Sequence, residues 1–111
     1  MLESRYYKTS SRMPAYEYIK KQDDISVDRI TKEMERLDKY GLDFALRDRT
    51  VKKIHPHPIY ELRVKVGRLK HRLLFTIKEQ ILWYVSGFMK KTSKTPKNEI
   101  DTAVKRAKEI C

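Results

Sequence analysis

The spacing of apolar positions predicts two helices in the first half of the chain. Pro14 suits the first turn of a short helix. A longer helix follows, because apolar residues recur at intervals of three and four: Val27, Ile30, Met34 and Leu37. Ser26 is predicted to cap this helix, with Ile25 and Ile30 as a hydrophobic staple, and Gly41 is predicted to end it. Both helices are expected to cover the core.

The second half changes to the alternation of strands. Strands are predicted over residues 51–54, 59–66, 69–77 and 81–88. Gly67-Arg68 fits a two-residue type II′ turn between the second and third of them. Thr95-Pro96 then opens a final helix. This order predicts a small α+β domain, in which two N-terminal helices pack on an antiparallel sheet and a C-terminal helix follows.

The turn at 67–68 fixes the register of the hairpin, so that the residue numbers of each antiparallel pair sum to 135. One face is apolar and is expected to pack under the helices. The other face pairs Lys65 with Lys70 and Arg63 with Arg72. Each like-charged pair is unfavourable by roughly a few tenths of a kcal/mol or more. Either these long side chains splay into solvent, or the face holds phosphate between arginine forks and lysine charges.

The same alternation, carried across the turn at 78–80, places Tyr84, Phe88 and Lys90 on this basic face. An aromatic ring beside guanidinium groups suits a stacked, unpaired base. A bulge in the turn would shift this assignment by one residue. Further lysines cluster before the final helix: Lys90, Lys91, Lys94 and Lys97. They form either an anion site at the helix N-terminus or a flexible basic loop.

Length and composition narrow the class of protein. The 111 residues fit a single domain, 1–111, with a net charge of +11, and residues 51–111 hold 15 basic and 5 acidic side chains. This excess predicts a polyanionic partner. The apolar run 80–89 is too short to span a membrane, no signal-peptide core is present, and Cys111 is the one cysteine. A cytoplasmic protein with no membrane contact is expected. Three glycines exclude the Walker loop and the dinucleotide fingerprint.

Three segments are distinctive when taken together: Tyr60-Glu61-Leu62-Arg63, Arg72 within a hydrophobic strand, and GFMKKTSKTPKNEI from Gly87 to Ile100. They resemble the phage-derived, HigB-like branch of the RelE/ParE toxin superfamily, over roughly residues 14–107. The resemblance implies a RelE-like fold and the toxin of a type II toxin–antitoxin module. RelE- and HigB-like members cut messenger RNA on the ribosome. A cognate helix-turn-helix, HigA-like antitoxin neutralises such a toxin, and operator DNA is bound only by the complex.

The resemblance also implies that Arg63 and Arg72 bind and polarise the scissile phosphate, with Lys90 and Lys91 as basic residues after the last strand. Cleavage by the neighbouring 2′-hydroxyl needs a base, an acid and stabilisation of the phosphorane charge, but no metal ion or cofactor. Arginine stays protonated, so the base is sought at Lys65, Lys90 or His57. The catalytic candidates are Arg63, Arg72, Lys90 and His57, and the RNA-binding candidates are Lys65, Lys70, Tyr84, Lys91 and Lys94.

The histidines and two other functions complete the sequence hypotheses. His71 falls on the apolar face and fits a packed core histidine better than a catalyst, and His55 and His57 fit a surface loop. A ParE-like gyrase inhibitor and a non-catalytic basic nucleic-acid-binding module are the alternatives to an RNA-cleaving toxin. The opposed arginines favour the toxin, because a transition-state site needs convergent charge, whereas a binding module spreads its charge along a track.

Overall fold

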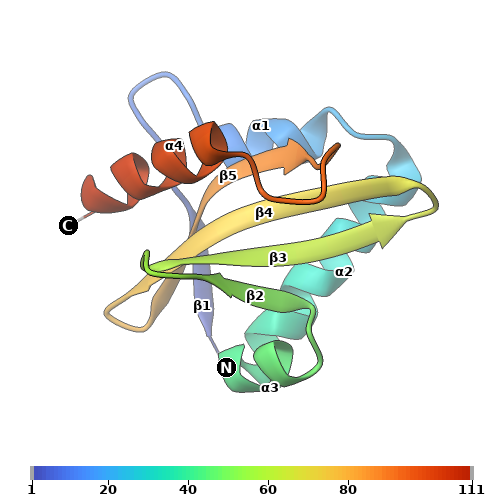
Figure 1. Ribbon diagram of the computed structural model, residues 1–111, viewed down its shortest axis with the longest axis horizontal. Coiled ribbons are helices and arrows are strands. Elements are labelled where there is room, and N and C mark those ends of the chain that lie inside the picture. The colour runs from blue at the N-terminus through green and yellow to red at the C-terminus, as the bar shows by residue number, and fades with distance from the viewer. Residues whose placement is uncertain (1, 111) are drawn as a thin grey trace.

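A computed structural model describes residues 2–110 and shows a five-stranded sheet with helices on both sides (Figure 1). The elements in chain order are β1 (Glu3–Tyr6), α1 (Pro14–Lys20), α2 (Asp24–Tyr40), α3 (Leu42–Arg47), β2 (Val51–Ile54), β3 (Ile59–Val66), β4 (Leu69–Lys78), β5 (Ile81–Met89) and α4 (Lys97–Lys108). The strand order is β1-β5-β4-β3-β2. The α+β class predicted from the sequence is therefore confirmed. Among the described residues, no helix has both the length and the apolar character needed to cross a bilayer.

Two elements escaped the sequence prediction, and one of them changes the sheet. Strand β1 joins the edge beside β5 in parallel, with Glu3 opposite Ile81 and Tyr6 opposite Tyr84. The expectation of a wholly antiparallel sheet was therefore wrong. Helix α3 is the other addition, and it is only six residues long. Both are short, and β1 depends on a pairing partner in a distant part of the chain.

The start of α2 differs from its predicted cap. Asp23 is the N-cap, and its carboxylate accepts a hydrogen bond from the backbone N–H of Ser26 at 2.8 Å. Ser26 itself lies in the first turn and is buried. Ile25 is 72% exposed, so the predicted hydrophobic staple does not form. Gly41 does end the helix, as expected, with a φ of 89° that favours glycine.

The hairpin of β3 and β4 has the register that the sequence predicts. Arg63 faces Arg72 and Lys65 faces Lys70. In the other pairs of this hairpin the two residue numbers also sum to 135. Gly67 has a φ of 60°, whereas Arg68 keeps a negative φ, as a type II′ turn requires. The turn therefore sets which side chains of the two central strands share a face.

Each face of the sheet has its own core. Helices α1, α2 and α3 pack on the face that carries Leu62, Val64, Leu73 and Phe75, with Ile30 and Leu37 among the buried contacts. Helix α4 crosses the opposite face, where Ala103 and Ala107 pack on Leu74, Val85 and Phe88. Figure 1 shows α4 along one end of that face, while β3 and β4 extend beyond it. The part of this face that α4 does not cover carries the paired cations of β3 and β4.

A β-bulge in β5 changes which face Tyr84 occupies. Leu74 pairs with Ser86, but the next residue, Phe75, pairs with Tyr84, so Val85 has no partner in β4. Tyr84 consequently turns into the core beside Phe75 and is 1% exposed. The sequence prediction that Tyr84 lies on the basic face was wrong, whereas Phe88 does lie there, opposite Arg72.

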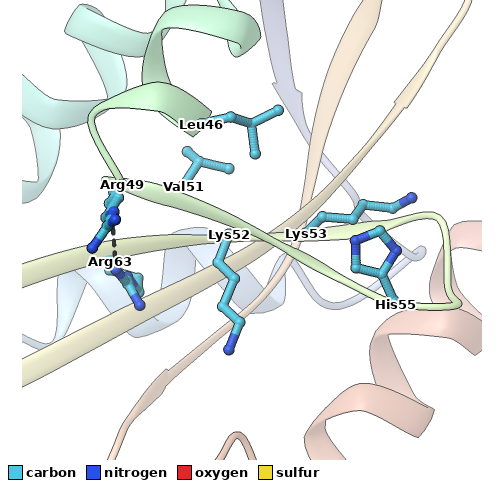
Figure 2. Close-up of a pocket in the computed structure, with 7 residues that line it drawn as sticks. All are labelled: Leu46, Arg49, Val51, Lys52, Lys53, His55 and Arg63. Carbon is cyan, nitrogen blue, oxygen red and sulfur yellow. Dashed lines mark hydrogen bonds between the residues drawn. The ribbon is translucent and has the colours of Figure 1, made fainter.

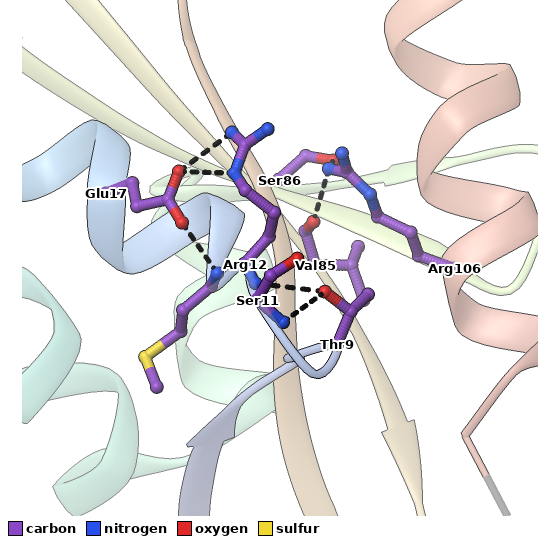
Figure 3. Close-up of polar contacts among 8 residues, drawn as sticks. Thr9, Ser11, Arg12, Glu17, Val85, Ser86 and Arg106 are labelled. Atoms are coloured by element: carbon purple, nitrogen blue, oxygen red, sulfur yellow. Dashed lines mark hydrogen bonds and ion pairs between the residues drawn. The ribbon is translucent and has the colours of Figure 1, made fainter.

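Helix α4 holds the bulge in place. Arg106 Nη1 donates hydrogen bonds to the backbone oxygen of Val85 and to Ser86 Oγ, both at 2.8 Å (Figure 3). On the other face of the same strand, a Cβ added at Gly87 would lie 2.7 Å from Tyr18 Cδ2. Glycine at this position thus permits the close approach of α1, while the arginine satisfies the backbone that the bulge exposes.

His71 is a structural residue of the core, as the alternation of the hairpin predicts. It is fully buried, and its Nδ1 lies 2.7 Å from the hydroxyl of Tyr18 and its Nε2 2.9 Å from Ser26 Oγ. Burial lowers the pKa of His71, the nearby Asp23 raises it and Arg72 lowers it. The net direction is downward, so the folded protein favours the neutral ring.

We expect the protein to lose stability as the pH falls from 7 to 5. His71 has a lower pKa in the folded state than its unfolded value of about 6.5, so the unfolded state binds more protons in this range. This contribution is present above about pH 6.5 and is lost as the pH falls toward the folded pKa. Urea unfolding at both pH values measures it.

The variant His71→Gln separates this histidine from the other titrating groups. It is expected to be less stable at pH 7 by about 1–3 kcal/mol, because its side chain cannot make both buried hydrogen bonds of the ring. Its loss of stability between pH 7 and 5 is expected to be smaller than that of the wild type. An equal loss in both proteins would contradict a role for His71 in acid sensitivity.

Candidate phosphate site

The uncovered part of the sheet carries the opposed cations at different depths. Lys65 and Lys70 are exposed near the hairpin turn. Arg63 is half-buried, and its Nη2 donates a hydrogen bond to the backbone oxygen of Arg49 at 2.8 Å. Arg72 is only 8% exposed. The lysines therefore offer charge at the surface, whereas the arginines are held by the fold.

The guanidinium of Arg72 keeps an unsatisfied donor. Its Nη1 donates to the backbone oxygen of His71 at 3.0 Å, and its Nε lies 3.7 Å from Glu61 Oε1, too far for a hydrogen bond. Within residues 2–110, this Nε is one of three buried side-chain polar atoms that have no hydrogen-bond partner, and Glu61 is its ion-pair partner. A buried donor without a partner is unfavourable unless a ligand satisfies it. Burial lowers the pKa of Arg72, Glu61 raises it and Arg63 lowers it.

Glu61 connects the hairpin to the segment before α4. It is 1% exposed and lies beside Arg72, and its Oε2 accepts a hydrogen bond from the hydroxyl of Thr95. Thr95 directly precedes Pro96, the N-cap residue of α4. One buried carboxylate thus holds the lysine-rich segment 90–95 against the strand that carries Arg63.

Lys90 lies within this cluster of charges. Its backbone N–H donates to the oxygen of Lys70 at 2.8 Å, which continues the pairing beyond the end of β5. Burial lowers the pKa of Lys90, Glu61 raises it, and Arg72, Arg63 and Lys52 lower it. The net direction is downward. Lys90 therefore lies within the electrostatic reach of both arginines.

The structure brings some of the remaining candidates together and leaves others apart. Lys94 lines a hollow with Lys90, whereas Lys91 is exposed beside it. His57 lies in the turn before β3, while Arg63 stands four residues, or about 13 Å, beyond the start of that strand. Tyr84 lies on the opposite face of the sheet. Neither His57 nor Tyr84 shares the site with the arginines.

Three residues of the site were not identified from the sequence. Lys52 stands opposite Glu61 on the neighbouring strand β2, and it contributes to the field at Lys90. Glu61 and Thr95 were noticed only as parts of a motif. Glu61 could have been identified from its spacing of two residues from Arg63, which puts both side chains on one face of β3. The register between β2 and β3 could not be deduced, because a turn of four residues with two prolines separates them.

The arrangement is suited to an anion with several oxygens. Two guanidinium groups on adjacent strands present planar donors, and Lys90 adds a nearby ammonium group. Because Arg72 is almost buried, its field is less screened than that of a surface cation. Such donors stabilise negative charge that grows on a phosphate during its reaction.

Comparison with known proteins places this α+β domain in a family. The sequence profile of the phage-derived Gp49-like proteins (DUF891) matches residues 17–108. The chain therefore belongs to this family, which is RelE-like or toxin-like. No curated protein matches the chain. The match spans α1 to α4, so it includes both arginines, Glu61 and the lysine-rich segment.

The variants Glu61→Gln and Thr95→Val test the buried connection. Glu61→Gln leaves Arg72 buried without its counter-charge, so we expect a loss of about 3–5 kcal/mol in the free energy of unfolding. Thr95→Val removes one hydrogen bond to a carboxylate, and a loss of about 1–3 kcal/mol is expected. Urea denaturation measures both.

Thr92→Val is the matched control. Thr92 is exposed, and its hydroxyl donates to the backbone oxygen of Lys94. We expect this variant to stay within about 0.5 kcal/mol of the wild type. If Glu61→Gln were no less stable than Thr92→Val, Glu61 would not be the counter-charge of Arg72.

Proposed function

We propose that this protein is the toxin of a type II toxin–antitoxin module and a ribosome-dependent, metal-independent endoribonuclease that cuts messenger RNA. The observation that carries this proposal is the buried guanidinium of Arg72, which has a donor without a hydrogen-bond partner and lies beside Arg63 and Lys90. Membership of a RelE-like or toxin-like family supports it, and so does the resemblance of the YELR and KKTSKTP segments to the HigB-like branch.

The proposed reaction is attack by the 2′-hydroxyl of one nucleotide on its own 3′-phosphate. Arg72 and Arg63 bind the non-bridging oxygens and stabilise the charge of the phosphorane. The 5′-oxygen of the next nucleotide leaves and takes up a proton, and a 2′,3′-cyclic phosphate remains. Both arginines stay protonated throughout, because their role is to hold charge and orient the phosphate.

Lys90 is the proposed general base. A lysine whose pKa is lowered by burial and by neighbouring cations is neutral more often at pH 7 than a free lysine. His57 is less suitable, because it lies in the turn before β3 and away from both arginines. Lys91 and Lys94 are close enough to Lys90 in the chain to bind the RNA beside the site.

Transcript mapping after induction in bacteria tests the nuclease. Wild-type protein is expected to arrest growth and to produce codon-phased ends in translated messages. Arg72→Ala is expected to abolish these ends, because loss of one transition-state donor reduces a rate by about 10²–10³. Arg72→Lys keeps the charge without the planar fork, and Arg63→Gln changes a side chain that is only half-buried, so these two variants serve if Arg72→Ala fails to fold.

Arg29→Ala is the control, since Arg29 is an exposed cation on α2. It should cleave like the wild type. Growth arrest with DNA breaks and intact messages would instead identify a ParE-like gyrase inhibitor. RNA binding without cleavage or growth arrest would leave a basic nucleic-acid-binding module.

The proposed partner is a HigA-like helix-turn-helix antitoxin, through which alone the toxin reaches operator DNA. The exposed Lys65 and Lys70 favour an antitoxin that covers the basic face with acidic side chains. The double variant Lys65→Gln/Lys70→Gln is therefore expected to bind the antitoxin at least about tenfold more weakly in a titration by calorimetry. Lys20→Gln/Lys105→Gln is the control, and equal affinities for both double variants would place the antitoxin elsewhere.

A further inference from the structure

Two hollows flank the edge strand β2. The first has a volume of about 450 Å³ and lies between β2, the segment after α3 and β3 (Figure 2). The second, of about 410 Å³, lies between β2 and the lysine-rich segment before α4. Lys52, Lys53 and His55 line both of them. The two hollows therefore adjoin the same edge strand, and together they are here called the β2 trough.

The lining of the β2 trough is cationic. The charged side chains of the first hollow are Arg49, Lys52, Lys53 and Arg63, and those of the second are Lys52, Lys53, Lys90 and Lys94. In the described part of the chain, no acidic residue lines either hollow. Like charges gathered in this way repel one another, so the trough favours a ligand with more than one negative charge.

Arg63 joins the trough to the phosphate site. Its guanidinium donates to the backbone oxygen of Arg49 and faces Arg72 across the hairpin. In Figure 2, Arg49 and Arg63 lie together at one end of the hollow, and the side chain of Lys52 extends in the same direction as Arg63. A chain of phosphates seated at Arg72 would thus meet Arg63 next and then Arg49.

The depth of Arg72 favours an unpaired strand. Its side chain is only 10% exposed, so a phosphate must enter a recess to reach it. A single strand can bend its backbone into such a recess, whereas a stiff duplex resists bending over this length. The partly exposed apolar side chains of Leu46 and Ile54 in the trough suit ribose or base surfaces between the phosphates.

We propose that the β2 trough binds the backbone of single-stranded RNA next to the scissile phosphate, with Arg49 as the contact for a neighbouring phosphate. This inference rests on the proposed function for the identity of the reacting phosphate. It adds a second phosphate subsite and a path for the RNA strand along β2.

Binding of 2′-O-methylated oligonucleotides tests the trough, because these RNAs lack the attacking hydroxyl and stay intact. Fluorescence anisotropy is measured with a labelled hexanucleotide and a labelled dinucleotide without terminal phosphates, across a range of salt concentrations. For Arg49→Gln, the salt slope with the hexanucleotide should fall by about 0.7, because the variant leaves one phosphate charge unneutralised. The dinucleotide has one phosphate, so its binding should be unchanged. Lys20→Gln/Lys105→Gln should match the wild type with both RNAs.

The outcomes separate this inference from the proposed nuclease. A wild-type slope for Arg49→Gln would overturn the trough, even if Arg72→Ala abolished cleavage. A reduced slope would support the trough, even if the protein cut no RNA in cells. Equal weakening of the dinucleotide would place Arg49 at the same phosphate as Arg72 and overturn the second subsite. Equally strong binding of a duplex of the same length would overturn the single-strand assignment.

Discussion

The ion pair between Glu61 and Arg72 is the constraint on which the arrangement of this protein depends. It is buried on the face of the sheet opposite α1 and α2, and Thr95 donates to the same carboxylate. A buried charge is tolerable only with compensation, and here each charge compensates the other. The pair is incomplete, because Arg72 Nε has no hydrogen-bond partner. The fold therefore holds a cation in place without fully neutralising it, which is the condition that an anion site requires.

The sheet shows how a small domain can keep such a site. Its α1–α3 face is packed with apolar side chains, and α4 covers only part of the other face. The packed side supplies hydrophobic stabilisation in proportion to the area that it buries. The repulsion between the opposed cations is small by comparison, at roughly a few tenths of a kcal/mol for each pair. A single sheet can thus carry a stable core on one side and an unfavourable charge arrangement on the other.

The sequence predicted those features that depend on local chemistry. The register of the β3–β4 hairpin followed from the Gly67-Arg68 turn, and the burial of His71 followed from that register. Tyr84 was misplaced because the bulge at Val85 is held by Arg106, a residue of α4 that no pattern within β5 indicates. Strand β1 was missed because its pairing partner lies far along the chain. Lys52 was missed because its place beside Glu61 depends on the register between β2 and β3, and no two-residue turn fixes that register.

The division of the site along the chain has a consequence for its biogenesis. Arg63 and Arg72 come from one hairpin, but Lys90 and Thr95 follow the last strand, and β1 can pair only after β5 exists. During synthesis the arginines leave the ribosome first, and Glu61 then lacks Thr95 until the segment before α4 emerges. The order of the sequence thus makes the assembly of the charged site a late event, and a nascent chain that ends before residue 90 has none of the lysines next to the last strand.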